Sequence, residues 1–317
     1  MDRYTKIGGQ DFFSVSPKEI TMIFNKKMVG MKLLKFLTAA ILAAGSWSAS
    51  AAVVTIPQSA LVSSNYYYTD LIGGGIGNPL TMTGGGNAAN VGGQRNDDGY
   101  SGPIPLGFTL NFFGSPYTQF WANNNGNISF NNGISKYTPT SPQGVAGPII
   151  SPFFADVDTR NTASGLMYLR NDIPSEIIVT WDQVGYYNNQ ADKLNSFQLV
   201  LRGPDYSVPA GEGSIGFFYK TMQWDTGGAS GGNLGFGGTP AAVGFGDGAG
   251  NGEVLEGSIQ AGISQVVNNH HIWFDRSANP VPEPTVNAVP VPAAVWLFGS
   301  GLAGLLGLAK RRNRKMQ

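Results

Sequence analysis

The fold is decided by the stretch Gly147-Pro-Ile-Ile-Ser-Pro-Phe-Phe-Ala-Asp-Val-Asp-Thr-Arg160. Pro148 and Pro152 exclude a helix interior, because proline has no N–H to donate and its ring clashes with the preceding turn. The isoleucines, phenylalanines and valine around them favour a strand packed between two layers. The stretch therefore predicts a buried strand with an acidic exit.

Composition extends this prediction to the whole chain. The 317 residues include 45 glycines and only 13% charged residues, against roughly 25% charged in an average globular protein. A chain poor in helix formers and rich in turn formers is typical of an all-β protein. Because there is no cysteine, a disulfide framework, a thiolate metal site and a cysteine nucleophile are all excluded.

Apolar residues at a spacing of two predict further strands, each with one core face. The expected core sets are Phe108, Leu110 and Phe112; Ile177, Val179 and Trp181; Phe197, Leu199 and Leu201; and Ile215, Phe217 and Tyr219. Asn-Gly-rich turns punctuate them. The pattern indicates a sandwich or an open barrel, and we expect a single β-sandwich-like domain of many short antiparallel strands over residues 52–276. The glycine-rich segment 71–95 is expected to form turns or a long surface loop.

Several motifs in this region occur together in a fixed order. They are Leu106-Gly-Phe-Thr-Leu-Asn-Phe-Phe-Gly114, Asn123-Asn-Asn-Gly-Asn-Ile-Ser-Phe130, Pro148 to Arg160, Val179-Thr-Trp-Asp-Gln-Val-Gly-Tyr-Tyr187, Lys193-Leu-Asn-Ser-Phe-Gln-Leu-Val-Leu201, Met222 to Gly232 and Gly237 to Phe245. Together they resemble the nidogen-like (NIDO) extracellular domain, from about Leu106 to Arg276. The resemblance implies an extracellular β-rich module of matrix, mucin-like and tectorin-like proteins, with no catalytic role ascribed to it and no known ligand.

The amino end has the three parts of a secretory signal peptide over residues 31–51. Lys32 and Lys35 form its positive region, residues 33–44 its short apolar region, and Ala49-Ser50-Ala51 an A-x-A cleavage site with Ala49 and Ala51 as the small residues. The apolar run is too short for a membrane span. We expect export by the Sec machinery, and residues 1–30 to be an unstructured leader or to lie before the true start.

The carboxyl end combines a proline-rich linker, residues 277–292, with an apolar run and a basic tail, residues 293–317. The run Ala293–Ala309 is roughly 25 Å long as a helix, marginal for a bilayer core of about 30 Å. A membrane stop is expected at Lys310, Arg311, Arg312 and Arg314, which would stay in the cytoplasm. A permanent tail anchor is one interpretation of this helix.

The order of the same parts resembles a PEP-CTERM sorting signal of the VPxP type. The matching residues are Pro282, Glu283 and Pro284, and Val289, Pro290, Val291 and Pro292 before the apolar run. The resemblance implies processing by an exosortase, a membrane peptidase, in a Gram-negative bacterium that makes exopolysaccharide. The precursor would be held transiently in the inner membrane and then pass to the cell surface or extracellular matrix. Pro282-Glu283-Pro284 lies further from the apolar helix than the corresponding motif does in the family. The exosortase could therefore recognise either Pro282–Pro284 or Val289–Pro292.

Charge is unevenly distributed along the chain. The segment between residues 52 and 309 carries eight basic and 17 acidic residues, a net charge of about −9, although the whole chain sums to zero. A domain with this balance repels phosphate backbones. Nucleic acid is therefore excluded as a partner.

Asp156 and Asp158 are weak candidates for a Ca²⁺ site. As neighbours at i and i+2 on a strand, they and Arg160 are expected to share one face, and carboxylates suit hard cations. The alternative is that one caps the following turn and the other pairs with Arg160. Since Ca²⁺ takes six or more oxygens, the alternative is favoured, and we expect no cofactor or metal.

A carbohydrate site is a second hypothesis. Asp182, Asp192 and Asp225 could supply the two carboxyl groups of a glycoside hydrolase. Sugar-stacking candidates are Trp181, Tyr186, Tyr187 and Trp224, although such residues more often fill a β core. The only histidines, His270 and His271, are adjacent and point to opposite sides of a strand, which excludes joint metal ligation.

The sequence as a whole predicts an exported, non-catalytic interaction or adhesion protein of the cell surface, matrix or biofilm. Its expected partners are the exosortase, extracellular polysaccharide or matrix proteins. The main competitor is a carbohydrate-binding or carbohydrate-cleaving domain on the same anchor, and a third possibility is a purely structural spacer.

Overall fold

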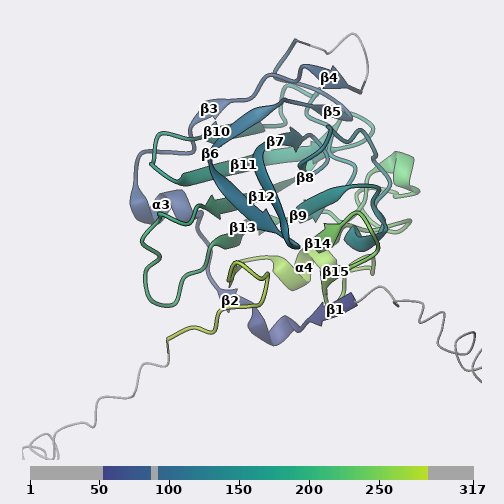
Figure 1. The fold of residues 1–317 in the computed structure, drawn as a ribbon. Helices are drawn as coiled ribbons and strands as arrows, with labels where there is room; N and C mark the ends of the chain where they lie inside the picture. Colours follow the sequence, from purple (N-terminus) through teal and green to yellow (C-terminus); the bar gives the residue numbers. More distant parts are fainter. Residues whose placement is uncertain (1–52, 87–91, 285–317) are drawn as a thin grey trace, which may run out of the picture. The chain divides into compact units, whose positions relative to one another are not determined.

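The structure is a computed structural model that describes residues 53–86 and 92–284, and these residues form two β-sheets (Figure 1). The nine-stranded sheet has the order β1-β15-β14-β9-β8-β7-β5-β4, and β6 also pairs with β7. Its strands are β1 (Val53–Ile56), β15 (Gly252–Leu255), β14 (Ala242–Asp247), β9 (Pro148–Phe154), β8 (Asn127–Ser129), β7 (Ser115–Asn123), β5 (Gly99–Tyr100), β4 (Gly84–Gly85) and β6 (Ile104–Phe112).

The seven-stranded sheet has the order β2-β16-β13-β12-β11-β10-β3. Its strands are β2 (Val62–Ser63), β16 (His270–Phe274), β13 (Ile215–Met222), β12 (Gln190–Arg202), β11 (Glu176–Tyr186), β10 (Leu166–Arg170) and β3 (Asn78–Pro79). Short helices α3 (Tyr68–Ile72) and α4 (Ile263–Val267), with 3₁₀ turns such as η4 (Gly228–Ser230), connect the strands. The all-β prediction is confirmed.

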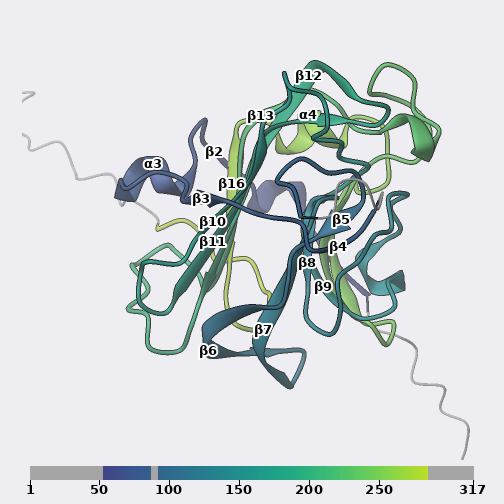
Figure 2. The same ribbon diagram turned by 90° about the horizontal axis from the view of Figure 1, so that it is seen from above.

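The two sheets pack face to face, as Figure 2 shows edge-on. Phe153 of β9 contacts Phe197 of β12 with ring centroids 5.6 Å apart, and Phe217 of β13 stacks on Phe245 of β14 at 5.3 Å. These rings are fully buried. The arrangement is a sandwich, because aromatic side chains from both inner faces interdigitate in one core.

The period-two core faces predicted for β11, β12 and β13 are confirmed, since every one of those side chains is at most 3% exposed. Strand β9 is buried along its whole length, as its sequence predicts. On β6, Leu110 and Phe112 are buried and Phe108 is only partly so.

One strand pair differs from the antiparallel prediction. Strand β1 pairs in parallel with β15, with Val53 opposite Gly252, whereas the other paired strands of the described residues run antiparallel. Parallel neighbours need a long crossover in place of a hairpin. Here most of the domain lies between the two strands, so no local pattern could indicate their pairing.

The glycine-rich segment is partly ordered into sheet edges by β3 and β4. Gly77 has a φ of +95°, and a Cβ there would lie 2.1 Å from the carbonyl oxygen of Leu169. Only glycine allows this backbone to approach β10 so closely. Residues 87–91, within the same segment, lie outside the described part.

The described domain continues past the boundary expected at Arg276. Ala278 is buried, Pro280 bridges to Phe274, and the Val281 N–H donates to the carbonyl oxygen of Trp273 at 2.8 Å. The first residues of the expected linker, 277–284, thus pack on the sandwich.

The predicted leader, signal peptide, remaining linker, apolar run and basic tail lie outside the described residues. Among the residues that are described, no helix is both long and apolar enough to cross a bilayer.

Candidate functional site

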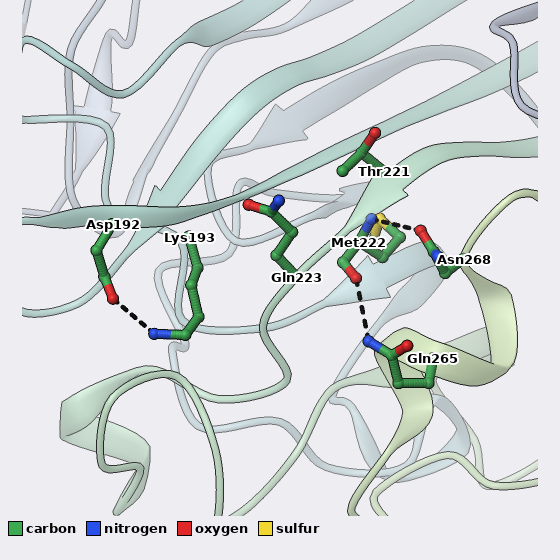
Figure 3. Close-up of a pocket in the computed structure, with 7 residues that line it drawn as sticks. All are labelled: Asp192, Lys193, Thr221, Met222, Gln223, Gln265 and Asn268. Carbon is green, nitrogen blue, oxygen red and sulfur yellow. Dashed lines mark hydrogen bonds and ion pairs between the residues drawn. The ribbon is translucent and has the colours of Figure 1, made fainter.

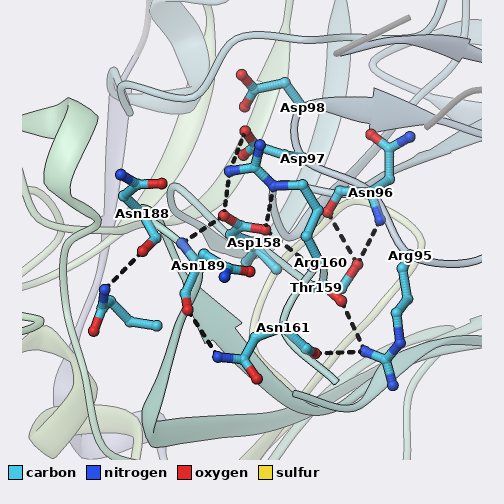
Figure 4. A network of polar contacts seen from close by, with 12 residues as sticks. Arg95, Asn96, Asp97, Asp98, Asp158, Thr159, Arg160, Asn161, Asn188 and Asn189 are labelled. Carbon is cyan, nitrogen blue, oxygen red and sulfur yellow. Dashed lines mark hydrogen bonds and ion pairs between the residues drawn. The ribbon is translucent and has the colours of Figure 1, made fainter. Parts of the chain in front are cut away.

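The polar groups at the exit of β9 form a network of hydrogen bonds and ion pairs (Figure 4). Asp158 is fully buried. Its Oδ1 accepts from the Arg160 backbone N–H (3.0 Å) and Nε (2.9 Å), and its Oδ2 accepts from Arg160 Nη2 (2.6 Å) and the Asn189 N–H (2.8 Å). Both carboxylate oxygens are thus engaged in turn capping and ion pairing. The structural alternative divided these two roles between Asp156 and Asp158, whereas Asp158 performs both.

Arg160 joins two segments of the chain. Its Nη2 also lies 3.0 Å from Asp97 Oδ2, and its guanidinium sits over the ring of Tyr187. The hydrogen bonding of Arg160 to Asp158, which accepts from the guanidinium, is the largest of the influences that raise the pKa of Arg160. The guanidinium therefore stays charged, and it ties the Asp97 turn to the exit of β9.

Arg95 makes a second tie between the same segments. Its Nη1 donates to the carbonyl oxygens of Thr159, Asn161 and Ser164, each at 2.8 Å. Because a guanidinium presents several donors in a rigid fork, one side chain can organise this whole loop.

Asp156 is brought next to Asp97 and Asp98. One carboxylate oxygen from each of the three residues lies within 4.8 Å of the others. Asp97 and Asp98 were not predicted from sequence as site residues. They reach Asp156 only because an isolated β-bridge aligns Asp97 with Asp158, which lies far away in the sequence. Two consecutive acids in a turn were the only local sign of them.

Burial dominates the electrostatics of this cluster. Desolvation, followed by the charges of Asp98 and Asp97, raises the pKa of Asp156 to about 8. Desolvation and the negative charges of Asp158 and Asp98 raise the pKa of Asp97 to about 7, although the positive charge of Arg160 acts to lower it. A carboxyl group moved out of water titrates higher because its charged form loses hydration.

The acids proposed for sugar cleavage each serve a structural role instead. Asp182 accepts a hydrogen bond from the Tyr67 hydroxyl at 2.8 Å. Asp192 accepts from the Tyr186 hydroxyl at 2.7 Å and pairs with Lys193. Asp225 accepts from the N–H groups of Gly262 and Ser264 at 2.8 and 2.7 Å, which holds the start of α4.

The tryptophans proposed for sugar stacking are fully buried. The Trp181 ring stacks on Phe197 at 5.0 Å and its Nε1–H donates to the Asn124 carbonyl at 3.1 Å. Trp224 Nε1–H donates to the Val184 carbonyl at 3.1 Å. The stacking prediction is therefore wrong for both: such large apolar side chains gain more by filling the core.

A polar depression of about 410 Å³ lies beside the end of β13 and α4 (Figure 3). Its lining is Asp192, Lys193, Thr221, Met222, Gln223, Gln265 and Asn268. Asn268 Oδ1 accepts from the Met222 N–H at 2.9 Å, so the lining is largely satisfied internally. With a single carboxylate and no histidine in its lining, this depression does not provide a pair of groups for acid–base hydrolysis.

The two histidines point to opposite sides of β16, as predicted. His270 Nδ1 lies 2.8 Å from the Asn268 carbonyl, whereas His271 is buried against Phe218 with ring centroids 5.0 Å apart. His271 Nδ1 is 3.0 Å from Ser64 Oγ, and burial lowers the pKa of the imidazole.

The same His271 touches the first of the two expected sorting elements. Its Nε2 lies 3.4 Å from Glu283 Oε1, and Pro284 lines a cavity with Gly211. The other expected processing residues, Ala49, Ala51, Val289–Pro292 and the basic tail, lie outside the described residues.

Comparison with known proteins identifies the domain. The sequence model described as NIDO related matches residues 78–281, more than half of the chain. The chain belongs to the NIDO-related family. The match begins at β3 and ends at Val281, so the NIDO-related domain starts earlier than the expected Leu106. It includes residues 78–95 of the glycine-rich segment, which carry no periodic pattern of their own.

The relatives of this NIDO-related chain include much larger proteins. It is 34% identical over 181 residues to alpha-tectorin of Gallus gallus and 35% identical to that of Mus musculus, in each case over 48% of this chain and 8% of the relative. It is 27% identical over 124 residues to nidogen of Drosophila melanogaster, over 31% of this chain and 9% of that protein. The chain therefore spans less than a tenth of these relatives. No solved structure matches it.

Proposed function

We propose that this chain is an exported, cell-surface or exopolysaccharide-associated interaction protein whose NIDO-related domain works by adhesion and not by catalysis. The observation that carries the proposal is the family match, which spans nearly all of the described sandwich. The NIDO resemblance implies an extracellular module, and parts of alpha-tectorin and nidogen are similar in sequence to the domain.

The engagement of the candidate acids supports a non-catalytic role. A hydrolytic pair needs two carboxyl groups that face one substrate. Asp182, Asp192 and Asp225 each bond a different part of the fold. None of the three is free to act as a general acid without breaking a structural contact.

An adhesion assay tests this role directly. Cells of a Gram-negative, exopolysaccharide-producing host would carry either the full chain or a chain lacking residues 53–284, with both ends kept. The full chain should increase retention on a surface coated with the host's exopolysaccharide or matrix. Equal retention of the two strains, with equal amounts of each protein at the surface, would contradict adhesion by the domain.

Sorting by an exosortase is the second part of the proposal, and the domain contacts favour Val289–Pro292 as the recognised element. Glu283 Oε1 lies 3.4 Å from His271 Nε2, and the Val281 N–H donates to the Trp273 carbonyl oxygen, so this part of the linker lies against the sandwich. A peptidase binds an extended chain, which a docked segment does not offer. Alanine at Val289–Pro292 should therefore block processing more strongly than alanine at Pro282–Pro284, measured by accumulation of precursor on immunoblots; the reverse order would contradict it.

Carbohydrate binding is a second candidate, favoured by a cavity of about 360 Å³ on the outer face of the seven-stranded sheet. Tyr66, His271 and Trp273 line it together with Glu212 and Glu283. Aromatic faces beside carboxylates can stack on and bond a sugar ring. Glycan-array binding by the wild-type chain, lost in Tyr66→Ala, would support it, and no binding to any glycan would remove it.

A further inference from the structure

We propose that Asp97, Asp98 and Asp156 form a binding site for a divalent hard cation, most suited to Ca²⁺, that joins the turn before β5 to the exit of β9. The two segments are far apart in sequence and meet beside the Asp158–Arg160 network (Figure 4). This inference is independent of the adhesive function proposed above.

The geometry fits one ion. The three carboxylate oxygens lie within 4.8 Å of one another. Two oxygens bound to the same Ca²⁺ at its usual 2.3–2.6 Å can be no more than about 4.6–5.2 Å apart. The three carboxylate oxygens are therefore close enough together to coordinate the same ion.

The burial and hydrogen bonding of the Asp156 side chain give a second, independent observation that points to a ligand. Its side chain is 1% exposed, and neither of its oxygens has a hydrogen-bond partner at normal distance and angle among the described residues, although the backbone N–H groups of Ala229 and Ser230 lie close enough to lower its pKa. A buried polar group without a partner costs about 1–3 kcal/mol, and more when charged. The backbone at Gly227 packs directly against this carboxylate, since a Cβ there would lie 2.5 Å from Oδ2.

The other two carboxylates also keep oxygens for a ligand. Asp97 is 6% exposed, and its Oδ2 pairs with Arg160 while its Oδ1 is buried without a partner among the described residues. Asp98 Oδ1 accepts from Asn125 Nδ2 at 2.7 Å. Each carboxylate thus has at least one oxygen without a hydrogen bond or ion pair from the described residues.

The nearby cationic groups do not neutralise the cluster. Arg160 pairs with Asp158 and Asp97, and its charge also lowers the pKa of Asp98. Lys136 approaches only through its carbonyl oxygen, because its ammonium donates to Thr140. The acids Asp97, Asp98, Asp156 and Asp158 therefore face one guanidinium, and a dication would restore balance.

The ion is expected to be Ca²⁺ in preference to Mg²⁺. Mg²⁺ requires near-ideal octahedral geometry and keeps several waters, whereas Ca²⁺ accepts irregular sets of carboxylate oxygens. Two of the three ligands are almost fully buried, which leaves little room for a hydrated ion. The partly exposed Asp98 lies on the side from which the ion and its remaining waters would enter.

Calcium titration of the full-length chain, purified in EGTA, tests the site. We expect one Ca²⁺ per chain by calorimetry, with MgCl₂ binding at least tenfold more weakly. For a Kd of about 10 μM, 1 mM Ca²⁺ should raise Tm by about 5–10 °C over EGTA. The proposal is overturned if the wild-type chain shows neither heat of binding nor a Tm shift, and the choice of Ca²⁺ is overturned if Mg²⁺ binds more tightly.

Variants localise the response. Asp156→Asn and Asp98→Asn should each weaken binding at least tenfold, because each removes a charged ligand oxygen. The exposed Asp172→Asn, whose partner is Arg170, is the matched control and should keep the full calcium shift. Wild-type affinity in both site variants would refute the assignment. If a variant does not fold, the wild-type titration alone still decides.

Discussion

At the residue scale, Arg202 shows how this protein pairs a buried charge. Arg202 is fully buried, and its Nε lies 2.8 Å from Glu176 Oε2 while its Nη2 lies 2.5 Å from Glu212 Oε2. Its guanidinium also stacks on the Trp273 ring, 4.3 Å from the centroid. This one side chain connects β11, β12 and β16 on the outer face of the seven-stranded sheet.

We expect Arg202→Ala to lower the free energy of unfolding by about 3–5 kcal/mol, because Glu176 would remain buried without its cation. Chemical denaturation measures the change. Lys220→Ala, which removes a surface partner of Asp70, is the control and should cost no more than about 1 kcal/mol. Similar losses of unfolding free energy in the two variants would contradict the claim that burial makes the Arg202–Glu176 pair more important than a surface pair.

A second residue-scale prediction concerns pH. Glu253 of β15 is 8% exposed, and burial, with a smaller contribution from Asp275, raises its pKa to about 7. A carboxyl group whose folded pKa exceeds its unfolded value of about 4.5 stabilises the fold at low pH, and this contribution is lost as pH rises from about 4.5 to about 7.

Glu253→Gln removes that titration. Relative to wild type, its free energy of unfolding should rise by up to about 3 kcal/mol between pH 4 and pH 8. Urea titrations of both proteins across this range give the difference. Parallel stability curves would mean that Glu253 titrates normally.

At the element scale, β9 is the strand on which the inner face of the nine-stranded sheet depends. Its seven residues are all buried. Phe153 reaches across the sandwich to Phe197 and meets Trp224 at 6.0 Å between ring centroids. We therefore expect that its packing contributes more than that of a phenylalanine in a surface loop.

Phe153→Ala should cost about 3–5 kcal/mol in the free energy of unfolding, because a large cavity would remain between the sheets. Phe236→Ala, at a side chain that is 42% exposed, is the same truncation outside the core. Its expected cost is under about 1 kcal/mol. Thermal unfolding of the two variants compares them, and equal costs would contradict the central role of β9.

The strands were predictable from sequence where their pattern was local. The alternation in Ile177–Trp181 and Phe197–Leu201 fixes which face is buried, and the prolines of β9 exclude a helix. The pairing of β1 with β15 and the meeting of Asp97 with Asp156 were not predictable, because both join segments that only the completed fold brings together. The roles of Trp181 and Trp224 were also not predictable, since the residue type alone does not tell whether an aromatic side chain fills the core or binds a ligand.

At the scale of the whole molecule, the described sandwich of this NIDO-related chain extends to Pro284. Near this end, the Val281 N–H donates to the Trp273 carbonyl oxygen. Under the function proposed above, export and sorting would act on the two ends of the chain and leave the domain intact.

Fractionation of a Gram-negative, exosortase-containing host that expresses the full chain tests this account most directly. Mass spectrometry of the termini should find the domain in the surface or matrix fraction, beginning near Ala52 and lacking the basic tail. Full-length, uncut protein in the cytosol, with none of the domain outside the cell, would contradict it.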